Sequence, residues 1–360
     1  NSFLPEDGGE PIFVAERNSG HAMNNDKVRI AFYARKQNRS PEGEVIEIIE
    51  RANDTFVGNL EVTKSYAFLV TEDITLANDI FIPAENLKNG KTGDKAIVRV
   101  VEWPQKAKNP IGEVIDILGR AGENTTEMHA ILAEFGLPYV YPKQIEQLAD
   151  QISDTIPEEE YKKRVDYRNV TTFTIDPKDA KDFDDALSVQ TFKNGDSEVG
   201  VHIADVTHYV KEGDTIDQEA EKRGNSVYLV DRTIPMLPER LSNFICSLRP
   251  NEEKLTYSIL FRFNNKKELV NSRIERTIIK SDQRFSYEEA QQRIETKEGS
   301  YSKEIILMHE LAEILRESRF QKGAINFDRV EVNFNLDENG KPLGVFFTQS
   351  KEANRLIEEF

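Results

Sequence analysis

The sequence predicts a mixed β and α+β protein, in which two small β-barrels in tandem precede a larger α+β domain. Three observations lead to this prediction: a repeat of strand-like segments near the start, an acidic stretch of helical character after it, and an aspartate-rich loop between strand-like segments. The chain has 360 residues, a length typical of two or three domains. With 38% hydrophobic and 31% charged residues, it has an ordinary composition for a protein with a buried core.

The internal repeat defines the two barrels. Ile12–Val14 matches Ile80–Ile82 at an offset of 68 residues, and Gly43–Ile46 matches Gly112–Ile115 at an offset of 69. Both copies alternate apolar and polar residues between turn residues, as short β-strands do. A unit of about 70 residues with five such strands is typical of the oligonucleotide-binding (OB) barrel.

The two copies of the repeat differ in length at their N-terminal ends. Only the second copy has the two additional strands Phe56–Val62 and Tyr66–Val70. We therefore expect a partial first barrel over residues 1–50 and a complete second barrel over 51–117. This pattern also predicts that the chain begins partway through its first barrel.

An acidic helical connector is expected over residues 118–169, before an α+β domain over 170–360. Within it, residues 121–160 contain nine acidic residues and one lysine, a local net charge of −8. Helices are expected over Met128–Phe135 and Pro142–Asp154, since Pro157 and its neighbours end the pattern.

The charge distribution bears on the class of partner. A net charge of −17 would argue against nucleic-acid binding if the charge were uniform. However, Lys27–Arg39 carries five basic residues and no acidic ones, with Phe32 and Tyr33 among them. These two residues, and Phe68 in the second barrel, are candidates for stacking on bases. A solvated strand face is the alternative for either barrel alone, and two barrels in tandem favour single-stranded nucleic acid.

Several classes of protein are excluded by simple features. No apolar run approaches the ~18 residues of a membrane span, and no signal peptide is visible at the start. Cys246 is the only cysteine, which excludes an intrachain disulfide and a cysteine-based zinc cage. A single cysteine is consistent with a reducing compartment, and we expect a cytoplasmic protein.

Five of the ten residues from Asp176 to Asp185 are aspartates, between strand-like segments Val170–Ile175 and Ala186–Phe192. Several carboxylates within a few ångströms of one another raise each other's pKa and need cations. Hard oxygen ligands of this kind select Mg²⁺, Mn²⁺ or Ca²⁺. We expect these carboxylates to converge on one cavity.

Two other interpretations of this loop are disfavoured. An EF-hand needs Gly and Glu at its positions 6 and 12, which are Lys181 and Leu187 here. A solvated acidic turn is disfavoured because Ile175, Phe183 and Leu187 anchor the loop in the core. The remaining interpretation is a magnesium site, of one or two ions, for phosphoryl chemistry.

The motifs between Thr174 and Leu248 resemble, in their order along the chain, those of the ribonuclease II/ribonuclease R exoribonuclease family. Thr174–Asp176 with Asp182–Ala186 resembles the first catalytic motif of that family. Further segments follow in the family's order: Val201–Val206, Asn225–Tyr228, Ile234–Pro238, Leu241–Asn243 and Cys246–Leu248. The resemblance covers essentially the whole chain and implies tandem cold-shock (OB) barrels followed by the N-terminal part of an α+β exoribonuclease domain.

The resemblance implies a processive 3′→5′ exoribonuclease. Its substrate would be single-stranded RNA with a free 3′ end, hydrolysed with Mg²⁺, or Mn²⁺ as a substitute, to nucleoside 5′-monophosphates. We expect a monomer with no membrane partner. The matching positions imply metal ligands at Asp176, Asp182, Asp184 and Asp185, catalytic roles for Asp184 and Asp182, and RNA contacts by Tyr228, Tyr287, Phe327 and Glu358.

The family pattern continues beyond Phe360 with a catalytic arginine motif, an S1 barrel and a basic tail, so the resemblance predicts a chain truncated at both ends. A missing cationic donor would remove stabilisation of the transition state, which leaves the activity of this piece open. The rival hypothesis is a tandem OB module that binds RNA without catalysis. A third hypothesis is a metal-dependent phosphodiesterase that acts on DNA or small nucleotides. The preference for RNA over DNA is inferred only from the resemblance to the family.

Overall fold

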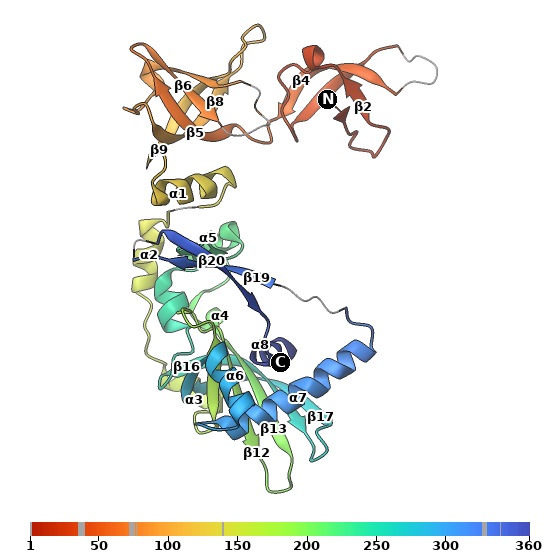
Figure 1. Ribbon diagram of the computed structural model, residues 1–360, viewed down its shortest axis with the longest axis vertical. Coiled ribbons are helices and arrows are strands. Elements are labelled where there is room, and N and C mark those ends of the chain that lie inside the picture. Colours follow the sequence, from red (N-terminus) through yellow and green to blue (C-terminus); the bar gives the residue numbers. More distant parts are fainter. Residues whose placement is uncertain are drawn as a thin grey trace. The chain divides into compact units, whose positions relative to one another are not determined.

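The computed structural model describes residues 2–34, 40–71, 76, 78–138, 140–325, 330–338 and 340–360 (Figure 1). The chain forms two compact units, Asn1–Tyr139 and Val140–Phe360, and each is presented by itself below. Within the described ranges, no helix has the length and apolar character needed to cross a membrane.

The first unit begins with an open four-stranded sheet. Its strands are β1 (Ser2–Phe3), β2 (Ile12–Val14), β3 (Lys27–Phe32) and β4 (Glu42–Glu50), in the spatial order β1-β2-β4-β3. Ile12 and Val14 are buried because alternate residues of a strand point to the same face. A short 3₁₀ helix, Glu16–Asn18, follows β2.

The second sheet of this unit is a closed five-stranded barrel. Its strands are β5 (Thr55–Val62), β6 (Tyr66–Thr71), β7 (Ile80–Pro83), β8 (Asp94–Glu102) and β9 (Ile111–Arg120), in the order β5-β6-β7-β9-β8. The repeat appears in the pairing, since Phe13 pairs with Glu42 and Phe81 with Ile111, both in parallel. The predicted fold class, with OB-type barrels before an α+β domain, is confirmed.

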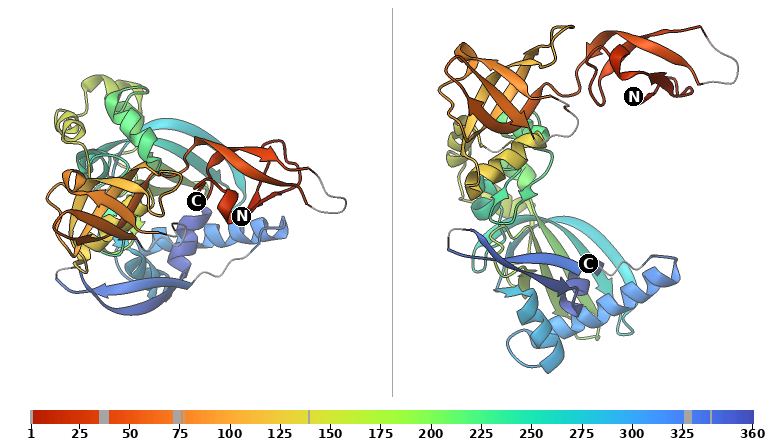
Figure 2. Two further views of the ribbon diagram at one scale, coloured as in Figure 1. Left: turned by 90° about the horizontal axis from the view of Figure 1, so that it is seen from above. Right: turned by 45° about the horizontal axis from the view of Figure 1, so that its top comes forward.

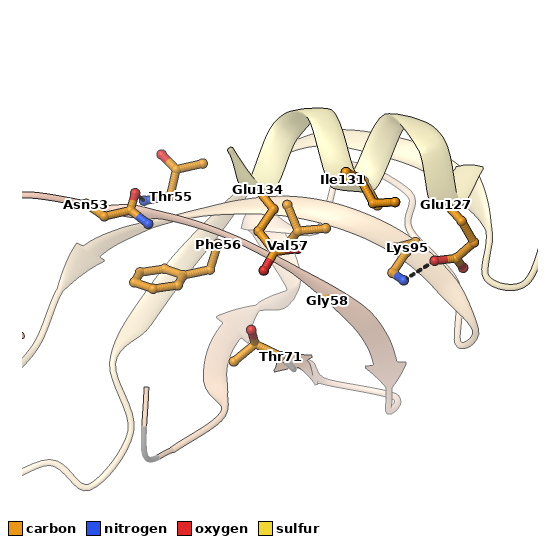
Figure 3. Close-up of a pocket in the computed structure, with 11 residues that line it drawn as sticks. Asn53, Thr55, Phe56, Val57, Gly58, Thr71, Lys95, Glu127, Ile131 and Glu134 are labelled. Carbon is orange, nitrogen blue, oxygen red and sulfur yellow. Dashed lines mark hydrogen bonds and ion pairs between the residues drawn. The ribbon is translucent and has the colours of Figure 1, made fainter. Parts of the chain in front are cut away.

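Helix α1 (Asn124–Glu134) packs against strands β5, β8 and β9 of the barrel. A cavity of about 270 Å³ lies between α1 and strands β5, β6 and β8. Figure 3 shows residues that line it, with Lys95 of β8 in an ion pair with Glu127 of α1. The acidic stretch expected over 118–169 is thus divided: α1 belongs to the first unit, whereas α2 (Lys143–Asp150) and α3 (Glu158–Lys163) belong to the second.

A seven-stranded sheet organises the second unit, in the order β10-β17-β16-β13-β12-β11-β18. Its pairs are antiparallel except β10–β17 and β11–β18. The strands are β10 (Val165–Asp166), β11 (Thr172–Asp176), β12 (Asp185–Thr191), β13 (Ser197–Ala204), β16 (Glu253–Phe263), β17 (Leu269–Lys280) and β18 (Gln283–Ser286). Two separate hairpins accompany it, β14–β15 (Val227–Tyr228, Thr233–Ile234) and β19–β20 (Val330–Leu336, Pro342–Gln349).

The two faces of this sheet bury different apolar clusters. Helices α6 (Tyr287–Thr296), α7 (Ser302–Gln321) and α8 (Glu352–Glu359) lie beside this sheet (Figures 1 and 2). They supply buried residues to the cluster that contains Phe173, Leu187 and Phe285. On the other face, α2, α5 (Thr215–Arg223) and a π-helix (Arg240–Ile245) pack around Ala186 and Leu260. The short helix α4 (Val206–Tyr209) follows β13 directly.

A polar side chain lies inside the second face. His202 of β13 is fully buried, and its ring nitrogens lie 2.6 Å from Ser258 Oγ and 2.8 Å from Ser188 Oγ, on the two neighbouring strands. Burial lowers the pKa of His202 to about 3, because the charged ring would lose its hydration.

We predict that this histidine makes the sheet less stable in mild acid. The folded-state pKa lies below the unfolded value of about 6.5, so this contribution is complete above about pH 6.5 and is lost as pH falls toward 3. Between pH 7 and pH 5 the opening free energy of β13 should fall by about 2 kcal/mol from this group. Native-state hydrogen exchange of β13, corrected for intrinsic rates, measures it. His202→Gln is the control, and an equal loss in that variant would contradict the assignment.

Candidate functional site

The aspartate loop connects the neighbouring strands β11 and β12 of the sheet in the second unit. Asp176 is the last residue of β11 and Asp185 the first of β12, and the two strands pair antiparallel at Phe173 and Leu187. All five residues of β11 are buried, so the loop leaves the sheet from a rigid base. The other two predicted ligands, Asp182 and Asp184, lie in the loop between the strands.

The loop backbone is held by two side chains that sequence reasoning missed. Arg284 of β18 donates to the carbonyls of Pro177 and Lys178, and its guanidinium lies 5.5 Å from the centre of the Phe183 ring. Ser247 accepts from the amide of Phe183 at 3.0 Å and donates to the carbonyl of Lys181 at 3.2 Å. Arg284 carries no local sequence signal for this role, and Ser247 lies in the segment Cys246–Leu248 to which the resemblance gave no role, because each reaches the loop only through the sheet topology.

Burial and mutual repulsion act on the carboxylates together. Burial raises the pKa of Asp176 to about 6, with the charge of Asp185 as a further cause. Burial also raises the pKa of Asp184, to which the charges of Asp182 and Asp185 contribute, and burial raises the pKa of Asp185. These groups are therefore close enough to influence one another, as the sequence pattern predicts for a cation site.

One buried oxygen supports a cation at this place. Asp176 is 7% exposed, and its Oδ2 atom is buried without a hydrogen bond of good geometry among the described residues, although the nearby Thr174 hydroxyl acts to lower the pKa of this carboxyl. A buried acceptor without a partner is costly, and a hard cation is a ligand that would satisfy it. The carboxylate oxygens of the loop are the donor type that Mg²⁺ and Mn²⁺ prefer, so the residues present fit such an ion.

The oxygens of the four predicted ligands do not all lie within the short distances of a bound ion, however. In the described ranges, no three of the four predicted ligands bring one oxygen each within 4.8 Å of one another. Mutual repulsion between like charges opposes a closer approach of these carboxylates. The group that does meet this distance consists of His309, Glu313 and Glu352, on α7 and α8, where Glu352 is already paired with Arg355.

Three of the predicted RNA contacts lie around the loop. The Tyr228 hydroxyl is 3.4 Å from Asp182 Oδ2, and the residue is 68% exposed. Tyr287 begins α6, and its pKa is raised to about 12 by burial and by the charges of Asp176, Asp185 and Glu358. Glu358, on α8, lies 3.9 Å from Arg316 of α7. The fourth, Phe327, lies outside the described residues.

The barrel candidates are exposed in part. Phe32 is 64% and Tyr33 44% exposed, although the Tyr33 hydroxyl donates to Glu44 at 3.0 Å. Phe68 forms an aromatic cluster with Tyr66 and Phe81, with ring centres 5.6–5.7 Å apart, which the sequence analysis did not single out. The basic residues at positions 35–39 lie outside the described ranges.

Comparison with known proteins defines the class of this fold and site. The RNB domain model matches residues 164–360 and a cold shock domain model matches residues 68–142. The chain therefore belongs to the RNB domain family. It is similar over its whole length to ribonuclease R of Thermotoga maritima, with 36% identity, 100% of this chain covered and 52% of the relative. The chain spans about half the length of the curated relatives it matches.

Solved structures show the same architecture. The apo form of Mycoplasma genitalium RNase R matches with a TM-score of 0.90 and 26% identity, covering 100% of this chain and 58% of that one. Its complex with ribose methylated single-stranded RNA matches with a TM-score of 0.89 and 24% identity, over 99% and 59%. Yeast Ssd1, a pseudonuclease, matches with a TM-score of 0.66 and 19% identity, over 89% and 46%.

We predict that Arg284 keeps the aspartate loop ordered. Arg284→Met removes two charge-assisted hydrogen bonds to the loop backbone, each worth about 1.5–3 kcal/mol. Hydrogen exchange of the Ala180 and Phe183 amides should then speed up at least about tenfold, while exchange in β12 stays unchanged. Gln283→Ala, on the same strand, is the control. Unchanged exchange in the loop of Arg284→Met would show that Ser247 alone holds it.

Proposed function

We propose that this chain belongs to a 3′→5′ exoribonuclease that hydrolyses single-stranded RNA processively to nucleoside 5′-monophosphates. The observation that carries the proposal is the aspartate loop at the end of two buried strands, bordered by the exposed ring of Tyr228 and by Tyr287. Membership of the RNB family supports it, as does the similarity to an RNase R in complex with single-stranded RNA.

Asp176, Asp182, Asp184 and Asp185 would hold one or two Mg²⁺ ions, with Mn²⁺ as a substitute. When bound, such an ion acts as a Lewis acid and stabilises the negative charge that develops on phosphate oxygens. Support for these ligands comes from the buried oxygen of Asp176 and from the pKa values of the loop aspartates, which burial raises.

In the proposed reaction, a water oxygen forms a bond to the last phosphorus of the RNA, and the bond to the 3′-oxygen of the preceding nucleotide breaks. Asp184 acts at the reacting phosphate, supported by Asp182. Tyr228 stacks on a base near the 3′ end while its hydroxyl remains near Asp182. Tyr287 of α6 contacts the RNA near its 3′ end, Glu358 of α8 contacts the terminal nucleotide, and Phe327 is proposed to pack against the stacked bases. These groups position the phosphodiester for in-line attack.

The barrels would hold the upstream part of the strand. Phe32, Tyr33 and Phe68 offer aromatic faces that stack without strong base preference, which suits an enzyme that degrades any sequence. Contacts of neighbouring Lys and Arg side chains with phosphates would make binding sensitive to salt. We further propose that the protein acts as a monomer in the cytoplasm.

A second candidate function is RNA binding without catalysis in this chain. The match to Ssd1 favours keeping this candidate, because the same fold occurs in a protein named as a pseudonuclease. The product ladder from 5′-labelled RNA with Mg²⁺, compared between this chain and the full-length protein, separates the two functions. RNA binding by this chain without any ladder would support the second.

We predict that Asp184→Asn in the full-length enzyme keeps RNA binding and abolishes cleavage. Binding depends mainly on phosphate contacts and stacking, whereas Asp184 acts on the reacting phosphate. Cleavage of 5′-labelled RNA should fall by at least about 10²-fold, with the dissociation constant from fluorescence anisotropy nearly unchanged. Asp179→Asn, in the same loop, is the matched control and should cleave normally. Near-normal cleavage by Asp184→Asn would refute the assignment.

We predict that Tyr228→Ala lengthens the final product without disabling hydrolysis. Stacking is worth about 1–3 kcal/mol per base, so its loss loosens the hold on the 3′ end and shorter RNAs dissociate uncut. A denaturing gel of the limit products measures this, and Tyr228→Phe should retain the parent length. If Tyr228→Ala stopped turnover and left the product length unchanged, this placement of the 3′ end would be wrong.

A further inference from the structure

A row of paired residues runs across the second unit's sheet from the aspartate loop. Asp185 of β12 pairs with Ile203 of β13, Ile203 pairs with Tyr257 of β16, and Tyr257 pairs with Arg276 of β17. Directly paired residues of antiparallel strands place their side chains on the same face. Neighbouring strands are about 4.8 Å apart, so the backbone of Tyr257 lies about 10 Å from that of Asp185.

This part of the face is exposed, although the same face is covered by α6, α7 and α8 further along. Ile203 and Tyr257 are each 49% exposed. Ile259 and Ile274, which pair with each other in the next row on this face, are 38% and 60% exposed. An apolar and aromatic strip therefore continues from the aspartate loop across β13, β16 and β17.

The strip ends in a cation over an aromatic ring. The Arg276 guanidinium lies 5.8 Å from the centre of the Tyr257 ring, within the range of a cation–π contact. Many arginines of this unit are engaged in ion pairs, but Arg276 makes none within 4.0 Å among the residues that the structure describes. Its charge contributes to lowering the pKa of Asp205, and its exposed side chain can also meet an anionic ligand.

From these observations we infer that Tyr257 and Arg276 form a second RNA-binding element, which holds the nucleotides immediately upstream of the cleaved one. A base stacks on the Tyr257 ring or on the isoleucines beside it, and Arg276 contacts the adjoining phosphate. The exposed cation favours RNA over an apolar protein segment as the occupant, since a phosphate pairs with it and an apolar segment would bury it without a close anionic partner. This inference rests on the proposed function, because it places the strand in relation to the aspartate loop.

The test measures binding separately from cleavage. In the full-length protein carrying Asp184→Asn, the affinity for a 5′-labelled single-stranded RNA is measured by fluorescence anisotropy over a series of salt concentrations. Tyr257→Ala should weaken binding about 5- to 150-fold, which corresponds to the loss of one stacked base. Tyr257→Phe keeps the ring and should bind within about twofold of the parent. Arg276→Gln should reduce the dependence of log affinity on log salt by about 0.7, as expected when one fewer phosphate of a single strand is neutralised.

The outcomes distinguish this inference from the proposed function. If the Asp184→Asn parent binds RNA but Tyr257→Ala binds equally well, the second element is refuted while the proposed function stands. A lower thermal unfolding midpoint of Tyr257→Ala with unchanged affinity would also overturn it, since the face would then be covered by protein. Failure of the parent to bind RNA, or normal cleavage by it, refutes the proposed function itself.

Discussion

The second unit depends on placing several negative charges beside an apolar core without leaving the backbone there unsatisfied. Asp176 ends a fully buried strand, and Asp185 begins the strand that pairs with it. Arg284 and Ser247 hydrogen-bond to the carbonyls of Pro177, Lys178 and Lys181 and to the amide of Phe183, so much of the unfavourable energy lies in the buried carboxylates. Burial makes the ionised form of these aspartates unfavourable, and this raises their pKa values while the sheet stays intact. A bound cation would offset the cost of burying these charges.

A second constraint is the register of the seven-stranded sheet. Ser188, His202 and Ser258 hydrogen-bond across three neighbouring strands, and Ser258 continues the network to Thr277 of β17. A buried polar network is stable only in the register in which every member has its partner. The same register sets the row on the other face, where Asp185 and Arg276 stand three strands apart. The buried hydrogen-bond network on one face of the sheet thus sets the register that aligns Asp185, Tyr257 and Arg276 on the other face.

The two copies of the repeat share strand pairing, and the second copy groups aromatic side chains on two of its strands. The equivalent strand pairs, β2–β4 and β7–β9, are both parallel, which shows that the repeat reflects a shared topology. In the second barrel, Tyr66, Phe68 and Phe81 gather on β6 and β7. Their proximity comes from pairing between these strands, because Phe68 and Phe81 are directly opposite each other. The proposed stacking of bases on this barrel would use such a group of rings rather than any single aromatic residue.

The sequence by itself determined the fold class, the repeat and the aspartate loop, because each depends on residues that are close together in the chain or recur at a constant offset. Periodicity and spacing are local properties, so Phe56–Val62 and Asp176–Asp185 could be recognised without coordinates. The tertiary structure alone placed Arg284 and Ser247 against the aspartate loop and Tyr257 in line with Asp185, because their partners lie tens of residues away in the sequence. It also decided that α1 joins the barrel rather than a separate connector. The physical reason is that contacts across a sheet depend on strand order and register, which a single sequence does not specify.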